Sequence, residues 1–237
     1  MRGNPRLARI TSRGAGILHR DLQERIVFCA DLSGRARQVC ASLAEGGEEV
    51  FGNRGEVEMA KVLVRYTDYF AQTIQRMRED GLLLVTLGAD GKPNVMTIGW
   101  GTIGSIWSRP VFIVLVRPSR YSYSRLEEIG DFTVNVPPRE LAVAASHCGT
   151  VSGRDHDKFH EMHLTPIPSR EVRPPIIREC VVHYECRTLH RNDLAPQALA
   201  QSVREEFYAN GDFHRIYFGE IVAASADEDA AQRLSAR

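Results

Sequence analysis

Short apolar runs separated by turn residues dominate the chain after about residue 60. Residues 82–87 have the sequence LLLVTL, which is short for a buried helix and typical of a buried strand. Gly-Ala-Asp-Gly at 88–91 predicts a turn, and further strands are expected at 94–100 and 111–116. Because the turn between the first two strands is short, they are expected to pair as an antiparallel hairpin.

Helices are expected between these strands. The pattern at 69–78 predicts a helix that ends at Asp80-Gly81, a usual stop signal. The other expected helices are 121–129, 141–147, a segment beginning at Ser152 with Asp155 as a capping-box partner, and 196–208; the other expected strands are 132–136, 179–189 and 214–224. Strands joined by hairpins, with helices inserted between them, predict a mainly β fold with helical insertions, an antiparallel barrel rather than a doubly wound sheet.

The segment 1–58 differs from the rest because it holds many Arg and no Lys. A helix at about 31–43 has little apolar periodicity, so a poorly structured N-terminal extension is expected. A second interpretation remains open. The acidic, glycine-rich sequences at 45–49 and 55–58 need purine-rich codons, which can form a ribosome-binding site before Met59. In that interpretation translation starts at Met59. In either case the main folded domain is expected to span 59–237.

Composition excludes some partners. Thirty basic residues balance thirty acidic ones, so bulk charge predicts neither a nucleic-acid nor a membrane partner. The apolar runs fall far short of the ~20 residues that span a bilayer, and no secretory signal is recognisable. Five scattered cysteines favour free thiols in a reducing compartment, so a cytoplasmic protein is expected.

A glycine motif at 99–104 matches G-x-G-x-x-G. A dinucleotide-binding loop of this kind lies between a strand and a helix, with an acidic residue about 20 positions later. Here the motif leads through Trp107 and Pro110 into another strand, and no Asp or Glu occurs between Asp90 and Glu127. The glycines therefore favour the close approach of a flat ligand or of a neighbouring backbone.

The same acid-free stretch is rich in cations. Residues 91–126 hold Lys92, Arg109, Arg117, Arg120 and Arg125 without a carboxylate. A phosphate group needs guanidinium forks, hydroxyls and free backbone N–H groups, and the sequence RPSRYSY at 117–123, followed by a helix N-terminus, offers all of them. These residues predict a phosphate site; a solvated basic loop that caps a helix is the alternative.

Several segments match a known family in order. They are NVMTIGWG at 94–101, RPV at 109–111, VRPSRY at 116–121, FTVNVP at 132–137, SGRD at 152–155, DKF at 157–159, EC at 179–180 and at 185–186, and HRIYFGEI at 214–221. Together they cover roughly residues 60–225 and resemble the flavin reductase-like, FMN-binding split-barrel family, in its flavoredoxin-like branch. No counterpart of residues 1–58 is recognisable.

The resemblance implies a homodimer that binds FMN beside the subunit interface. The residues that would lie along the isoalloxazine are Met96, Thr97, Ile98, Gly99, Trp100 and Gly101. Those that would hold the phosphate and ribityl chain are Arg117, Ser119, Arg120, Tyr121 and Tyr123. Asn135 and Val136 would line the pocket, Ser152, Gly153 and Lys158 would close it with Arg154 nearby, and His214 would be the catalytic residue facing the nicotinamide.

The implied function is hydride and electron transfer between NAD(P)H and flavin or a downstream acceptor, which includes a partner oxygenase. Two other functions stay open. One is an FMN-binding electron carrier or redox sensor without its own NAD(P)H reductase turnover. The other is a split-barrel oxidase that acts on a substrate like pyridoxamine phosphate. Ser119 and Ser152 lack the sequence context of a hydrolase nucleophile, so hydrolysis is not expected.

Two groups of His and Cys residues in the sequence have spacings that could suggest a metal site. His156, His160 and His163 have helical spacing that could hold a metal, but no supporting cysteine or carboxylate pattern is seen, so surface histidines and no metal site are expected. Cys180 and Cys186 would lie about 20 Å apart along an extended strand, too far for one ion. Together with His183 and His190 they favour buried thiols over a zinc site.

Overall fold

The computed structural model describes residues 61–235. The helix expected at 31–43 and the alternative start at Met59 lie outside these residues. Within them, one antiparallel sheet has the strand order β3-β2-β6-β9-β10-β5-β4, and β1 pairs with β10. The bounds are β1 Val62–Leu63, β2 Leu82–Leu87, β3 Pro93–Ile98, β4 Gly101–Ile106, β5 Arg109–Val116, β6 Asp131–Val136, β9 Val182–Asp193 and β10 Arg215–Ala226; β7 Pro166–Ile167 and β8 Ile176–Ile177 form a separate pair.

The continuous apolar run of β2 reflects burial on both faces of the sheet. Successive side chains of a strand point to opposite faces. Leu82 and Leu84 accordingly pack in one core cluster with Phe112, whereas Leu83 and Val85 pack in a second cluster under the helices. The strand is thus confirmed, and its lack of polar alternation has a structural cause.

The order of the strands shows that the sheet curls. β3 and β4 lie at opposite ends of the strand order, yet only Gly99 and Trp100 separate them in the sequence. Three peptide steps can span at most about 11 Å. The two ends of the sheet must therefore come together at this point. We call residues 98–101 the seam, and this closure of an antiparallel sheet confirms the predicted barrel architecture.

Strand β4 was not predicted from the sequence. The preceding strand, β3, was predicted to end at Trp100, but it ends at Ile98. The hairpin between β4 and β5 turns at Trp107 and Ser108, which have φ angles of 55° and 58°. Two successive positive φ angles are those of a type I′ turn. Type I′ turns favour Asn, Asp and Gly, and neither Trp107 nor Ser108 is one of these. The sequence around them therefore predicted neither the turn nor the strand before it.

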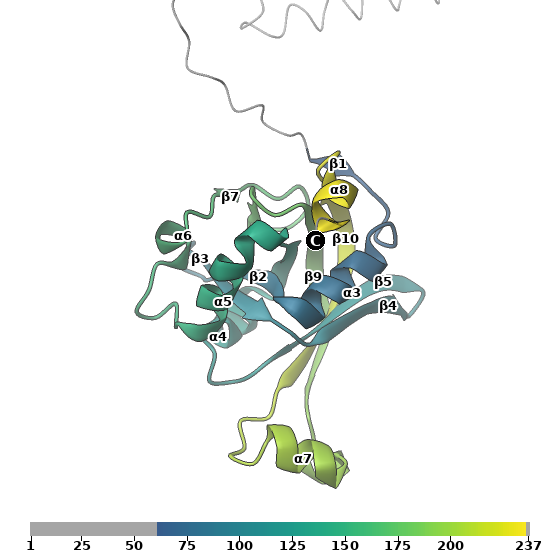
Figure 1. Ribbon diagram of the computed structural model, residues 1–237. Helices are drawn as coiled ribbons and strands as arrows, with labels where there is room; N and C mark the ends of the chain where they lie inside the picture. Colours follow the sequence, from purple (N-terminus) through teal and green to yellow (C-terminus); the bar gives the residue numbers. More distant parts are fainter. Residues whose placement is uncertain (1–60, 236–237) are drawn as a thin grey trace, which may run out of the picture. The chain divides into compact units, whose positions relative to one another are not determined.

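Helices lie over the sheet and connect its strands (Figure 1). They are α3 Phe70–Glu79, α4 Tyr121–Ile129, α5 Ala142–Thr150, α6 Lys158–Glu161 and α8 Ala230–Ser235, with a 3-10 turn η1 at Arg139–Leu141. The prediction that a helix begins at Ser152 is wrong. Asp157 caps α6 by accepting a hydrogen bond from the His160 backbone N–H, and residues 152–157 form turns before it.

The connection between β9 and β10 extends away from the rest of the sheet, as Figure 1 shows for α7. We call residues 194–214 the arm. The helix expected at 196–208 is broken there into η2 Pro196–Ala198 and α7 Gln201–Phe207. Leu199, with ψ of 140°, is extended between the two. In the part of the chain that the structure describes, no helix is both long and apolar enough to cross a membrane.

Candidate functional site

Two small neighbouring cavities lie at the seam and at the loops beside it. The strand cavity has a volume of about 170 Å³ and is lined by Met96, Thr97, Ile98, Gly99, Trp100, Leu115, Arg117, Arg120 and His214. The loop cavity has a volume of about 120 Å³ and is lined by Asn94, Met96, Ser119, Arg120, Tyr121, Ser122, residues 148–154 and Lys158. Both share Met96 and Arg120, so they lie side by side.

The charge of this lining is one-sided. Among the described residues that line the two cavities there is no Asp or Glu, whereas Arg117, Arg120, Arg154 and Lys158 all contribute. A surface with guanidinium and ammonium groups but no carboxylate attracts an anion. The acid-free stretch noticed in the sequence therefore becomes an acid-free cavity lining in three dimensions.

Lys158 is the most constrained of these cations, because its residue is only 4% exposed. Its ammonium donates hydrogen bonds to the backbone oxygens of Cys148, at 3.2 Å, and Val151, at 3.4 Å. Burial lowers the pKa of Lys158 by removing the charge from water. An ammonium has three donors, so an anion in the loop cavity would both accept the third and offset the cost of burial.

Arg120 precedes α4 and faces both cavities. Its guanidinium makes no hydrogen bond or ion pair with any residue between 61 and 235, whereas Arg109 pairs with Glu220 and Arg125 pairs with Asp90. No side-chain hydrogen bond from the described residues caps the N-terminus of α4, where the helix dipole favours an anion. Arg120 and this helix end together form the positively charged side of the loop cavity.

Arg117 and Ser119 have partners in the arm. Arg117 donates to the backbone oxygens of Asp212, at 2.9 Å, and Phe207, at 3.0 Å. The Ser119 hydroxyl donates to the Asp212 carboxylate at 2.6 Å. These two residues, predicted to hold a phosphate, thus fasten the arm to the loop after β5. Asp212 had no signal in the sequence, since its contact spans more than ninety residues.

Glycine at position 153 lets the loop between α5 and α6 approach β3 and the start of α4 closely. A Cβ atom there would lie 1.9 Å from Asn94 Oδ1, closer than real Cβ contacts allow, and in tight contact with the Tyr121 ring at 3.0 Å. Asn94 is itself held by a hydrogen bond to the Ser122 hydroxyl at 2.8 Å. The close approach at Gly153 therefore shapes the floor of the loop cavity.

An outer cleft of about 590 Å³ continues from the loop cavity, with which it shares Asn94, Tyr121, Gly153, Arg154 and Lys158. Arg154 donates to the Ser119 backbone oxygen at 3.2 Å and lies over the Tyr121 ring. Each small cavity alone falls below the ~300 Å³ typical of ligand pockets, whereas the connected spaces reach that range.

Thr97 and His214 lie on the strand side of the site. The Thr97 hydroxyl donates to the Ala145 backbone oxygen at 2.5 Å, which joins β3 to α5 and leaves the oxygen lone pairs as acceptors. His214 is 8% exposed, and its ring lies 4.9 Å from that of Trp100. Burial, together with the nearby Arg117, lowers the pKa of His214 to about 4. The imidazole is therefore neutral near pH 7.

A flavin reductase like domain matches residues 77–235 of the sequence. The chain belongs to the flavin reductase-like domain family. The resemblance inferred from the ordered motifs is thereby confirmed.

Solved structures of this family share the fold. Flavoredoxin of Desulfovibrio vulgaris (Miyazaki F) has a TM-score of 0.51 at 27% identity, over 63% of this chain and 70% of that chain. Flavoredoxin from Methanosarcina acetivorans has a TM-score of 0.50 at 26% identity, over 63% and 69%. An FMN-binding domain of a flavin reductase-like enzyme from Shewanella baltica OS155 has a TM-score of 0.52 at 17% identity, over 72% of this chain and 79% of that chain.

Among curated proteins, an uncharacterized protein of Archaeoglobus fulgidus is 37% identical over 106 residues, which is 45% of this chain and 59% of that protein. The match thus covers less than two thirds of that relative. An uncharacterized protein of Pyrococcus abyssi is 28% identical over 135 residues, which is 54% of this chain and 76% of the relative.

Most of the residues that the family resemblance selected do gather at the cavities. They are Met96, Thr97, Ile98, Gly99, Trp100, Arg117, Ser119, Arg120, Tyr121, Ser152, Gly153, Lys158 and His214. The sequence reasoning missed Asn94 on β3, Leu115 on β5, Ser122 on α4 and residues 148–151 at the end of α5. Arg154, expected nearby, is also present.

Four selected residues lie elsewhere in this member of the flavin reductase-like family. Asn135 and Val136 are fully buried, and the Asn135 amide bonds to Leu83 O, Ile177 N and His183 Nδ1 instead of a ligand. Tyr123 packs against the core with Arg215 over its ring. At Gly101 a Cβ would lie 2.6 Å from Ile113 O, so this glycine serves close strand pairing.

The buried thiols expected at Cys180 and Cys186 are confirmed, since both are fully buried and free. Burial raises the pKa of each thiol, which keeps it protonated and unreactive. His183 is also fully buried, and burial lowers the pKa of its imidazole. Cys180, His183 and Cys186 are therefore part of the core.

Proposed function

We propose that this chain binds FMN across the strand and loop cavities and transfers hydride and electrons between NAD(P)H and flavin or a downstream acceptor. The observation that carries the proposal is the acid-free lining that joins buried Lys158 to the seam through Arg120, whose guanidinium pairs with no residue between 61 and 235. A ligand with a phosphate at one end and a flat apolar body at the other fits this distribution of charge. Membership of the flavin reductase-like family and likeness to two flavoredoxins support flavin as that ligand.

The loop cavity would take the phosphate. Lys158 and Arg120 supply the positive charge, and the N-terminus of α4 supplies backbone N–H groups. The outer cleft then provides room for a ligand larger than either small cavity.

The seam would take the ring system. Met96, Ile98 and Gly99 offer an apolar strand edge, and Thr97 offers a hydroxyl acceptor. When bound, FMN supplies the electron-transfer chemistry itself. The protein orients it, and the neutral His214 imidazole can hydrogen-bond at the ring face without adding a positive charge.

We also propose a second copy of this chain as the partner that covers the arm. Trp100, Val203 and Phe207 are between 37% and 40% exposed, although they are large and apolar. Light scattering on the purified protein tests for a dimer. A partner oxygenase, or another acceptor of the electrons, and a cytoplasmic location remain predictions from the sequence.

FMN binding is tested by titrating the full-length protein with FMN and following flavin fluorescence. We expect Arg120→Ala to bind FMN about tenfold or more weakly, because a hydrogen bond to a charged group contributes about 1.5–3 kcal/mol. Arg109→Ala is the matched control, since this arginine belongs to the same acid-free stretch but pairs with Glu220 outside the cavities. A wild-type protein that takes up no FMN would overturn the proposal.

Reductase activity is tested separately. Anaerobic mixing of the FMN-loaded protein with NADH or NADPH should bleach the flavin absorbance rapidly. FMN binding without bleaching would identify the alternative, an electron carrier or redox sensor that is reduced by another donor.

A further inference from the structure

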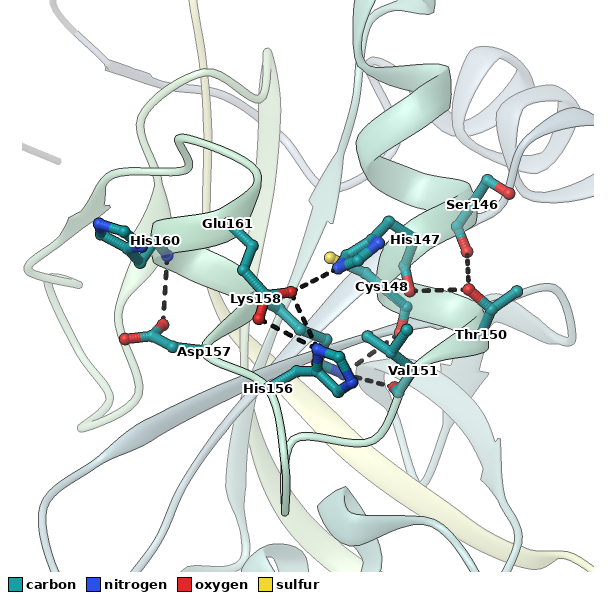
Figure 2. Close-up of polar contacts among 10 residues, drawn as sticks. All are labelled: Ser146, His147, Cys148, Thr150, Val151, His156, Asp157, Lys158, His160 and Glu161. Atoms are coloured by element: carbon teal, nitrogen blue, oxygen red, sulfur yellow. Dashed lines mark hydrogen bonds and ion pairs between the residues drawn. The ribbon is translucent and has the colours of Figure 1, made fainter.

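Three potential metal ligands meet at the junction of α5 and α6 (Figure 2). His147 lies in the last turn of α5, Glu161 ends α6, and His156 lies in the loop between these helices. Helical spacing had grouped His156 with His160 and His163 instead, and no metal site was expected there. Figure 2 shows the His160 ring lying away from the Glu161 carboxylate, which the other two rings approach.

The distances suit a single small cation. The Glu161 carboxylate lies 2.7 Å from His147 Nε2, and 3.0 and 3.2 Å from His156 Nδ1. The three ligand atoms all lie within 4.8 Å of one another. Tetrahedral zinc with bonds of about 2.0–2.1 Å needs ligand atoms about 3.4 Å apart. To reach this spacing, the 2.7 Å contact between His147 and Glu161 has to lengthen by about 0.7 Å, which their partly exposed side chains allow.

We propose that His147, His156 and Glu161 form a binding site for one divalent transition-metal ion, with zinc as the ion that their chemistry favours. Two imidazoles and a carboxylate are ligands that Zn²⁺ takes readily, whereas Mg²⁺ and Ca²⁺ prefer oxygen ligands alone. Three protein ligands leave the fourth position of a tetrahedral ion to water. His156 also lines the outer cleft, so that position is accessible to solvent.

The backbone around the ligands is held independently of the ion. The Thr150 hydroxyl donates to the backbone oxygens of Ser146 and His147, both at 3.1 Å, and Asp157 caps α6. The two helix ends that carry His147 and Glu161 are therefore pre-organised. Such support limits the ordering that an ion must impose on binding.

The site brackets the loop of the proposed flavin pocket. Residues 148–154, which line the loop cavity, begin directly after His147 and end just before His156. An ion bound to all three ligands would fasten both ends of this loop. This consequence rests on the proposed function, whereas the metal site itself does not, because none of its ligands lines the strand or loop cavity.

The test uses full-length protein without a histidine tag, dialysed against Zn²⁺ and analysed for bound metal. We expect about one zinc ion per chain in the wild type and roughly tenfold or weaker affinity in each of His147→Gln, His156→Gln and Glu161→Gln. His160→Gln and His163→Gln are matched controls from the same segment and should bind zinc like the wild type. Zinc should also raise the melting temperature of the wild type and of the controls but not of the three ligand variants.

Two results would overturn the proposal: no zinc retained by the wild type, or equal loss of zinc in the ligand and control variants, which would indicate adventitious surface binding. FMN affinity is measured on the same samples. Zinc binding without FMN uptake would support the metal site and overturn the proposed function. FMN uptake without zinc binding would support the proposed function and overturn the metal site.

Discussion

The Tyr208 hydroxyl lies 2.7 Å from Nδ1 of His214, and this hydrogen bond within the arm holds the imidazole that lines the strand cavity. Tyr208 follows α7, whereas His214 directly precedes β10. With Nδ1 engaged, Nε2 is the nitrogen that can face a ligand. The arm thereby sets the orientation of the imidazole at the site.

His214→Ala should slow reduction by NAD(P)H more than it weakens FMN binding, because the ring lies beside the seam and not among the phosphate-binding groups. Stopped-flow bleaching gives the first quantity and FMN titration the second. Tyr208→Phe, which removes only the hydroxyl, should show the same split with a smaller effect. An unchanged rate of flavin bleaching in His214→Ala would show that His214 does not take part in reduction by NAD(P)H.

The stability of the protein should fall as the pH drops from about 6.5 towards 4. His214 has a folded pKa of about 4, lowered by burial and by Arg117 and Arg120, while Asp212 acts in the opposite direction. Between these pH values the unfolded chain binds a proton at His214 and the folded chain does not. The free energy of unfolding therefore falls by on the order of 3 kcal/mol. Urea unfolding of His214→Gln should show a shallower loss over this range. Parallel pH profiles for the two proteins would contradict the assignment.

Arg117→Ala should release the arm as well as weaken FMN binding, since its guanidinium donates to the backbone oxygens of Asp212 and Phe207. Hydrogen exchange of the amides in 194–214 should accelerate, while those of β2 stay protected. Arg204→Ala, an exposed change within α7, serves as the control. Weaker FMN binding without faster exchange would mean that Arg117 contacts the ligand alone.

Gly153→Ala should reduce FMN affinity because the added Cβ would collide with Asn94 Oδ1 and force the loop between α5 and α6 away from β3. Gly104→Ala is the matched control, as a Cβ there meets nothing within 4 Å and its φ is not in the left-handed region. FMN titration of both variants decides the matter. Equal affinities would show that the pocket tolerates this displacement.

Phe132→Ala should destabilise the fold by about 3–5 kcal/mol, because Phe132 is fully buried in the core cluster and its removal leaves a cavity. Phe207→Ala, which changes a 40% exposed ring on the arm, should leave the free energy of unfolding of the core nearly unchanged. Urea denaturation measures both. A small effect at Phe132 would show that the barrel interior repacks easily.

The sequence alone was sufficient for features that depend on neighbouring residues. The run LLLVTL predicted β2, and Asp80-Gly81 marked the end of α3, since local apolar pattern and turn chemistry decide both. The ordered motifs also identified the family, and the acid-free stretch pointed to the cationic lining. Strand β4 escaped because its hairpin turns at Trp107 and Ser108, whose positive φ angles are imposed by pairing with β5.

Only the tertiary structure decided which side chains share a site. It brought His214 to Trp100, gave Arg117 and Ser119 their partner in Asp212, and buried Asn135 among backbone groups of the core. It also placed His147 and His156 on one carboxylate, which the helical spacing of the histidines did not suggest. Most of these contacts join segments that are distant in the sequence. The curvature of the sheet and the docking of loops set all of them, so local sequence patterns do not predict them.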